Sequence, residues 1–157
     1  MGNLQQVKNK ETLLLSHLRN NSREKLTSIS KKTGIPIATL FYLLKELEGN
    51  RYTKSTILLN FENLGYHSHA QIFLKVNRED KLKARTFLEK QDSVNTVYKT
   101  NNGWDFIIET VHNNIKQLDK FIEKIDENFE IKNHQIHYLI EEVKKEDFMK
   151  NKDSFIC

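Results

Sequence analysis

Cysteine, proline and glycine are all scarce in this sequence, and each scarcity excludes a class of protein. The 157 residues include one cysteine, Cys157, so neither an internal disulfide nor a thiolate metal cage is expected. One proline and five glycines exclude collagen-like and linker-like chains. The apolar runs are far shorter than the roughly 18 residues of a membrane span, and no signal peptide is apparent. We therefore expect a soluble protein of a reducing compartment, the cytoplasm, with no membrane partner.

What is present is enough apolar material for a core, and an uneven distribution of charge. Apolar residues make up 38% of the chain and charged residues 29%, which suits one ordinary domain or two small ones. Residues 1–55 contain ten Lys or Arg and four Glu, a net charge of +6, whereas residues 56–157 carry −2. A basic N-terminal third predicts contact with a polyanion. A lysine-rich surface that is merely solvated explains the same count equally well.

The first 50 residues are typical of three short helices. Leucines at helical spacing predict helices over Lys10–Asn20 and Ile37–Glu48, and Leu26–Thr33 forms a shorter one between them. Gly34 stands where a helix ends, and Pro36 stands where the next can begin. Two helices joined by a tight turn, with a third packed across them, form a helix-turn-helix.

The rest of the chain alternates between the strand period and the helix period. Asn101-Asn102-Gly103 predicts a hairpin turn, because Asn and Gly tolerate positive φ. The predicted elements are, in order, strand 53–59, connector 60–66, strand 70–76, helix 78–91, strand 94–100, strand 104–109, helix 113–128 and strand 136–140. From residue 70 on, this is the ferredoxin-like order βαββαβ with both helices on one face, so the predicted class is α+β.

Helices on one face of a four-stranded sheet leave the other face uncovered. Phe73 next to Leu74, and Ile107 next to Ile108, put apolar side chains on both faces. An exposed apolar sheet face needs a partner, and a second copy of the chain is the simplest one. We therefore expect a homodimer, with the number of dimers per assembly left open.

Three segments resemble the Lrp/AsnC (feast/famine) family of prokaryotic transcription regulators. Lys25–Leu47 is similar to the family's helix-turn-helix, Leu58–Tyr66 (LLNFENLGY) to its wing strand and connector, and Asn102–Ile107 (NGWDFI) to a hairpin of its sensing domain. The resemblance implies a winged helix-turn-helix DNA-binding domain over residues 1–55, a wing strand and connector over 56–67, a ferredoxin-like sensing and oligomerisation domain over 68–148, and a tail over 149–157. The partners it implies are double-stranded DNA and an amino-acid effector, and no cofactor is expected.

The third helix departs from the family pattern. Its middle positions hold Phe41, Tyr42 and Leu43, where the family usually carries arginines, and Lys45 is its only cation. Side chains that read bases are most often Arg, Lys, Asn or Gln, so we expect weak or unusual sequence preference. The predicted DNA contacts are Thr39, Tyr42 and Lys45 to bases, and Arg23, Lys31, Lys32, Arg51 and Lys54 to phosphates. The alternative is that Phe41 and Tyr42 are buried or form a protein–protein surface, in a ligand-sensing or assembly protein that has lost specific DNA recognition.

For an effector, the resemblance implies clefts between dimers beside the hairpin, which commonly hold amino acids. The local candidates are Asn101, Asn102, Gly103 and Asp105. The Asp105 carboxylate could accept an ammonium group, and the backbone N–H groups of the turn could bind a carboxylate. Turn chemistry alone explains Gly103 equally well.

Patterns for metal binding and catalysis are weak. The candidate ligands His67, His69, His134 and His137 have no cysteine or firm carboxylate partner, so we expect surface histidines and no metal site. No nucleophile elbow, phosphate-binding glycine loop or HExxH helix is present. Sirohaem decarboxylases share the expected architecture, but the basic, histidine-rich pocket that marks them has no counterpart around residues 94–112. We therefore predict that the protein is not an enzyme, with a decarboxylase as the least favoured alternative.

Overall fold

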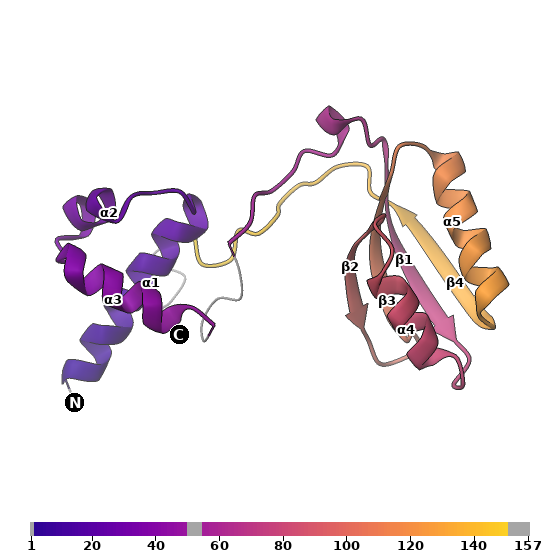
Figure 1. Ribbon diagram of the computed structural model, residues 1–157, viewed down its shortest axis with the longest axis horizontal. Helices are drawn as coiled ribbons and strands as arrows, with labels where there is room; N and C mark the ends of the chain where they lie inside the picture. The colour runs from indigo at the N-terminus through magenta and orange to yellow at the C-terminus, as the bar shows by residue number, and fades with distance from the viewer. Residues whose placement is uncertain (1, 50–54, 151–157) are drawn as a thin grey trace. The chain divides into compact units, whose positions relative to one another are not determined.

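The chain forms two compact units, one helical and one built on a sheet (Figure 1). The computed structural model describes residues 2–49 and 55–150, with side chains from residue 9 on. The helical unit comprises Met1–Leu58 and Lys144–Cys157, and the sheet unit comprises Leu59–Val143. Within these described residues, no helix has the length and apolar character needed to cross a membrane. Each unit has a hydrophobic core of its own, as a folding domain requires.

The helical unit is built from α1 (Gly2–Asn20), α2 (Leu26–Thr33) and α3 (Ile37–Leu47). The turn between α2 and α3 forms as the sequence predicts, because Gly34 adopts φ 72° and its N–H donates to the Ser30 carbonyl. α1 begins earlier than predicted, at residue 2 instead of residue 10. The buried core of the unit is entirely aliphatic: Leu14, Ile29, Ile35, Leu40, Leu43 and Leu47. The core residues of α3 lie on one side of the helix, so its opposite side faces solvent.

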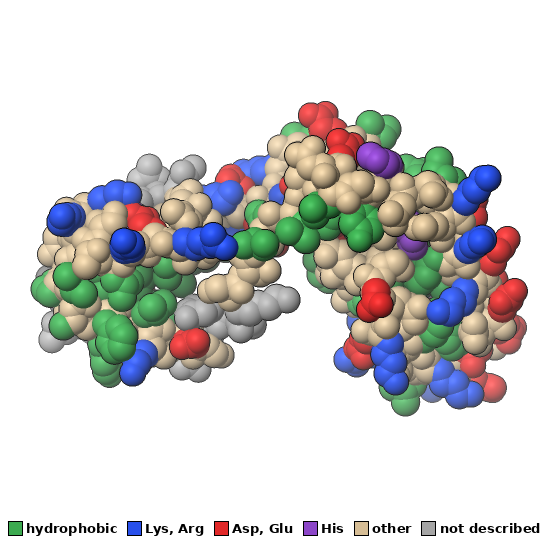
Figure 2. Space-filling model, turned by 45° about the horizontal axis from the view of Figure 1, so that its top comes forward, with side chains coloured by type: hydrophobic (Ala, Val, Ile, Leu, Met, Phe, Trp, Pro, Cys, Tyr) green, Lys and Arg blue, Asp and Glu red, His purple; other side chains and the backbone are tan. Residues whose placement is uncertain are grey.

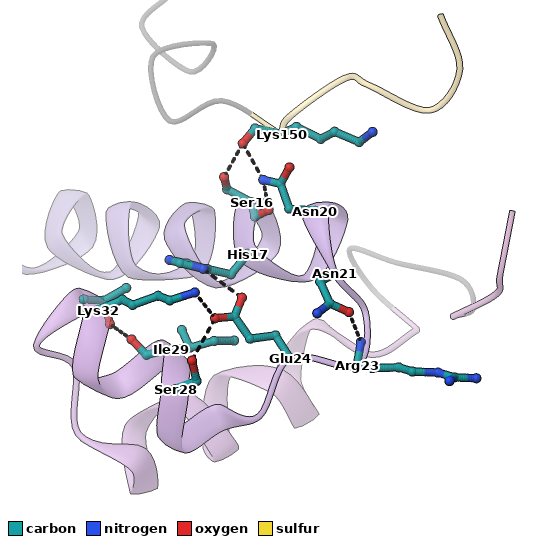
Figure 3. Close-up of polar contacts among 11 residues, drawn as sticks. Ser16, His17, Asn20, Asn21, Arg23, Glu24, Ser28, Ile29, Lys32 and Lys150 are labelled. Carbon is teal, nitrogen blue, oxygen red and sulfur yellow. Dashed lines mark hydrogen bonds and ion pairs between the residues drawn. The ribbon is translucent and has the colours of Figure 1, made fainter. Parts of the chain in front are cut away.

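A segment from the far end of the chain packs on α1. The Ser16 hydroxyl donates to the Lys150 carbonyl at 2.8 Å, and the Asn20 amide donates to the same oxygen at 2.9 Å (Figure 3). Arg19 donates to the Phe148 carbonyl at 3.1 Å. By packing, the chain therefore divides after residues 58 and 143, whereas the sequence analysis divided it after residues 55, 67 and 148. The assignment of a separate function to each of those segments remains a prediction.

The sheet unit has four antiparallel strands in the order β2-β3-β1-β4. Its elements along the chain are β1 (Ser68–Val76), α4 (Lys81–Glu89), β2 (Val94–Lys99), β3 (Phe106–His112), α5 (Ile115–Asn128) and β4 (Ile131–Tyr138). Ile72 and Ile108 pair across the centre of the sheet and are fully buried against residues of both helices, such as Leu88 and Leu118. This βαββαβ order confirms the predicted α+β, ferredoxin-like fold.

The second face of the sheet, which we call the open face, is covered by neither α4 nor α5. Burial alternates strictly along β1 and β3, so every second side chain belongs to this face. Phe73 lies directly opposite Ile107, as the sequence alternation predicts. On β1, β3 and β4, the residues of the open face are His69, Gln71, Phe73, Lys75, Ile107, Glu109, Val111, Asn133, Gln135 and His137.

Several predicted boundaries differ in the structure. β3 runs over residues 106–112 instead of 104–109, because its pairing with β1 extends to His112. Of the expected strand 53–59, residues 53 and 54 lie outside the described residues. Residues 55–59 form no strand, and the chain has no regular structure over 55–60 before the 3-10 turn η1 (Glu62–Leu64). A strand needs a neighbour for its backbone hydrogen bonds, and the described parts of the chain provide none there. α4 is shorter than predicted, because Asn77 and Asp80 close a turn before it. β4 begins at residue 131 instead of 136, because its pairing with β1 extends to Val76.

Candidate nucleic-acid interface and effector site

α1 and α2 are held together by a carboxylate that three side chains share (Figure 3). Glu24 accepts from Lys32 Nζ at 2.6 Å and from the Ser28 hydroxyl at 3.1 Å, and His17 Nδ1 lies 3.1 Å from its other oxygen. The Lys32 hydrogen bond lowers the pKa of Glu24 most, burial opposes it, and His17 and Ser28 add to the lowering, which brings the pKa to about 2 from the usual 4.5. Glu24 is therefore ionised at neutral pH and fixes the start of α2 against α1.

The solvent face of α3 is largely apolar. Ile37, Phe41 and Tyr42 leave 47%, 53% and 61% of their surface exposed. The Lys45 ammonium lies 4.8 Å from the centroid of the Phe41 ring, a cation–π distance. The Tyr42 hydroxyl donates to Glu46 at 2.8 Å, and this hydrogen bond raises the pKa of Tyr42. Phe41 and Tyr42 are thus exposed in the helical unit, and the alternative that they are buried within it is wrong.

The predicted DNA-contact residues differ in how available they are. Tyr42 and Lys45 are exposed on α3, and Thr39 is half-buried. Lys31 is exposed in the last turn of α2, while the neighbouring Lys32 is engaged by Glu24. Arg23 is exposed in the connector before α2, and Arg51 and Lys54 lie outside the described residues. Figure 2 shows Lys and Arg side chains spread over the visible face of the helical unit, with apolar side chains among them.

The predicted effector residues lie in the β2–β3 loop but do not form one cluster. Asn102 and Gly103 have φ of 59° and 107°, which confirms the turn, and both are exposed with Asn101. The Asp105 side chain is 12% exposed, and it accepts from Lys81 Nζ at 2.5 Å and from the Val76 backbone N–H at 3.0 Å. Asp105 therefore ties β3 to the end of β1 and to the first turn of α4.

The surroundings of Asp105 keep its carboxylate ionised. Burial by itself raises the pKa of Asp105, but the hydrogen bonds from Lys81 and from the Val76 N–H lower it by more, so the net pKa is below the usual 3.8. Lys75 Nζ lies 4.0 Å away and adds to the lowering. A ligand ammonium at this carboxylate would have to displace or join these cations of the chain itself.

A polar group lies on the open face at the β1–β3 pair. His69 Nε2 lies 2.7 Å from a Glu109 carboxylate oxygen, and Asn95 donates to the same oxygen at 3.1 Å. The ring of Phe61 meets the His69 ring edge-on at 5.3 Å between centroids. His69 thus has a carboxylate partner that the sequence analysis did not assign to it. Among residues 2–49 and 55–150, no three His, Cys, Asp or Glu side chains are grouped so as to hold a metal ion.

Comparison with known proteins agrees with this combination of a helix-turn-helix and a ferredoxin-like sheet. A family model described as the Lrp/AsnC ligand binding domain matches residues 69–148. An HTH-type transcriptional regulator of Pyrococcus horikoshii is 30% identical over 113 residues, which make up 69% of this chain and 75% of that protein. The chain belongs to the Lrp/AsnC family. Its curated relatives are named as transcriptional regulators.

Solved structures of other Lrp/AsnC proteins share the fold. Escherichia coli AsnC superposes with a TM-score of 0.77 at 21% identity, over 87% of this chain and 94% of AsnC. A Neisseria meningitidis transcriptional regulator, solved as a complex with L-Met, superposes with a TM-score of 0.78 at 16% identity, over 87% of this chain and 91% of that one. At such identities the likeness establishes the architecture of this Lrp/AsnC protein and nothing finer.

Sequence reasoning missed two contacts that position the helix-turn-helix of this Lrp/AsnC protein. Glu24, Ser28 and Lys32 are spaced four residues apart, and this spacing could have indicated that they lie on one face of α2 and its start. The contact of His17 with Glu24 comes from a different helix, and no local spacing in the sequence predicts it. The contact between α1 and Lys150 joins residues more than 130 positions apart, so it too could only come from the fold.

Proposed function

We propose that this Lrp/AsnC protein binds double-stranded DNA through α2 and α3, and that its sheet unit joins two copies and responds to a small molecule such as an amino acid. The observation that carries the proposal is the helix-turn-helix itself. Its aliphatic core and the Glu24 contacts hold α2 and α3 in a defined geometry, with the outer face of α3 and the cations Arg23, Lys31 and Lys45 exposed. In a helix-turn-helix, the second helix enters the major groove while flanking cations contact phosphates.

Salt dependence distinguishes phosphate contacts from other binding. Each phosphate that a protein cation neutralises releases condensed counterions, which makes log K fall with log salt concentration by about 0.9 per contact. We expect Lys31→Ala to reduce that slope by about 1 per subunit and to weaken binding to all duplexes alike. The measurement is a fluorescence-anisotropy titration of duplexes from the region upstream of the protein's own coding sequence, and of scrambled duplexes, at several salt concentrations.

The matched control is Lys120→Ala, which removes another exposed lysine, from α5 in the sheet unit. This variant is expected to keep the slope of the unmodified protein. If the unmodified protein retains no duplex even at low salt, DNA binding is contradicted. The favoured function is then a ligand-sensing or assembly protein, for which the exposed Phe41 and Tyr42 on α3 are the supporting observation.

Substitution of Asp105 tests the sensing role, because its effect on stability and its effect on ligand binding can be measured separately. We expect Asp105→Asn to destabilise the sheet unit by about 1 kcal/mol at neutral pH, because the charged hydrogen bond to the partly exposed Lys81 is lost. The folded-state pKa is depressed, so this stabilisation is present above about pH 3.8 and disappears as the pH falls below it. Thermal unfolding of both proteins between about pH 2 and about pH 7 measures the difference.

The same two proteins then report on an effector. In a melting-temperature screen of the common amino acids, an effector that uses the hairpin raises the melting temperature of the unmodified protein. If the Asp105 carboxylate binds the ligand ammonium, Asp105→Asn loses that increase. If backbone groups at Asn102 and Gly103 suffice, the variant keeps it. An increase with none of the amino acids would contradict the amino-acid effector.

A further inference from the structure

The outer face of α3 is apolar at the positions where a recognition helix reaches base edges. Ile37, Phe41 and Tyr42 occupy its first turn and a half, and Ala38 is exposed beside them. The residues of a recognition helix that contact bases lie toward its N-terminus. These four positions therefore hold the side chains that would meet the floor of the major groove.

The polar groups of this face are already engaged with one another. The Tyr42 hydroxyl donates to Glu46, and the Lys45 ammonium lies over the Phe41 ring. Bidentate hydrogen bonds to guanine come from Arg or Lys, and those to adenine come from Asn or Gln. The helix contains no Arg, Asn or Gln, and its single lysine is Lys45. The outer face of α3 therefore has few side chains that could form hydrogen bonds to base edges, and most of its exposed surface is apolar.

The major groove presents one apolar group, the C5-methyl of thymine. We propose that α3 recognises thymine methyl groups through Ile37 and Phe41, and that the preferred sites of this protein are therefore defined by the positions of thymines in each half-site. This inference rests on the proposed function, DNA binding. It adds the chemical feature that the helix reads.

The charges around the face favour DNA over a protein as its occupant. Lys45 lies on the face itself, and Lys31 and Arg23 are exposed in the adjoining α2 and its connector. The N-terminal 55 residues carry a net charge of +6. An apolar strip with cations at its edges suits a groove with methyl groups on its floor and phosphates along its rims.

Replacing thymine by uracil tests the inference, because uracil lacks only the methyl group. The tightest-binding sequence is first selected from a pool of random duplexes and then synthesised with either thymine or uracil. Burial of one methyl group corresponds to about a fourfold change in affinity. With methyl contacts in both half-sites, we expect the unmodified protein to bind the uracil duplex at least about tenfold more weakly.

Variants of α3 connect the effect to the proposed side chains. In the double variant Ile37→Ala/Phe41→Ala, the ratio of thymine to uracil affinity is expected to fall to nearly 1. Phe41→Leu, which keeps an apolar contact, is expected to retain most of the ratio. Lys31→Ala lowers both affinities and leaves the ratio unchanged. Circular dichroism and melting temperature show whether each variant is folded, and the measurement on the unmodified protein decides the question even where one is not.

The outcomes separate this inference from the proposed function. Equal affinity of the unmodified protein for the thymine and uracil duplexes overturns thymine-methyl recognition and leaves DNA binding intact. Failure to bind any duplex at low salt overturns both. If the double variant forms a smaller assembly than the unmodified protein in light scattering, with the thymine-to-uracil ratio unchanged, the face covers another copy of the chain and the inference is wrong.

Discussion

Substituting Phe73 by Asp is expected to give a monomer of 18.6 kDa, whereas we expect the unmodified protein to be a dimer. Phe73 lies on the open face at the centre of the sheet, where its ring meets the Trp104 and His137 rings at 5.8 and 5.2 Å between centroids. Ile107 lies directly opposite it on β3. An apolar cluster in this position is what a second copy would cover.

Symmetry makes the expected effect large. In a twofold interface the same substitution occurs on both subunits, so its cost counts twice. Losing the burial of one phenylalanine side chain costs about 2 kcal/mol, and two copies raise the dissociation constant by about a thousandfold. Light scattering of the unmodified protein and of Phe73→Asp at micromolar concentration measures the change, and Ile107→Asp is expected to repeat it.

Leu82→Asp is the matched control for this substitution. Leu82 is also a large apolar side chain, 74% exposed, but it lies on α4 and away from the open face. Its substitution is expected to leave the mass of the assembly unchanged. A monomeric unmodified protein, or a Phe73→Asp variant that remains dimeric and folded, would show that the open face is not the interface.

The sequence predicted most of the architecture because both units follow simple periodicities. α2 has the predicted bounds, since Leu26 and Ile29 mark its buried side and Gly34 can adopt the left-handed conformation that ends it. Strict alternation along β1 and β3 predicted which side chains share a face, and the burial pattern confirms it. Such local signals depend on spacing alone and need no knowledge of distant contacts.

What the sequence did not predict depends on residues that only the fold brings together. The ligand role of Asp105 came from the resemblance to Lrp/AsnC proteins, which implies an effector beside this hairpin, and it remains a prediction. No pattern in the sequence indicated the contacts that its side chain makes within the fold. In the structure its carboxylate is bonded to Val76 and Lys81, which precede it by 29 and 24 positions. The expected wing strand is a case in which a local signal was present but the structure did not form. Residues 55–59 have strand-forming composition, but a strand also needs a neighbouring strand, which composition cannot provide.

Substituting Leu40 by Ala is expected to unfold the helical unit and to abolish DNA binding, while the sheet unit stays folded. Leu40 is fully buried, with no exposed surface, among the six aliphatic residues of the helical core. Truncating such a leucine costs about 2–5 kcal/mol, because a cavity is left in addition to the lost burial. A small unit with so few buried side chains has a small free energy of unfolding, so a loss of this size is a large fraction of it.

The neighbouring residue supplies the control, because it lies on the same helix but on its other side. Phe41 is 53% exposed, so Phe41→Ala removes more atoms than Leu40→Ala yet is expected to change the melting temperature little. Amide hydrogen exchange measures the two units separately: Leu40→Ala should remove protection from α1, α2 and α3 and leave β1 and β3 protected. Protection lost from both units at once would show that they fold as one, because each unit's own core would then be insufficient to hold it.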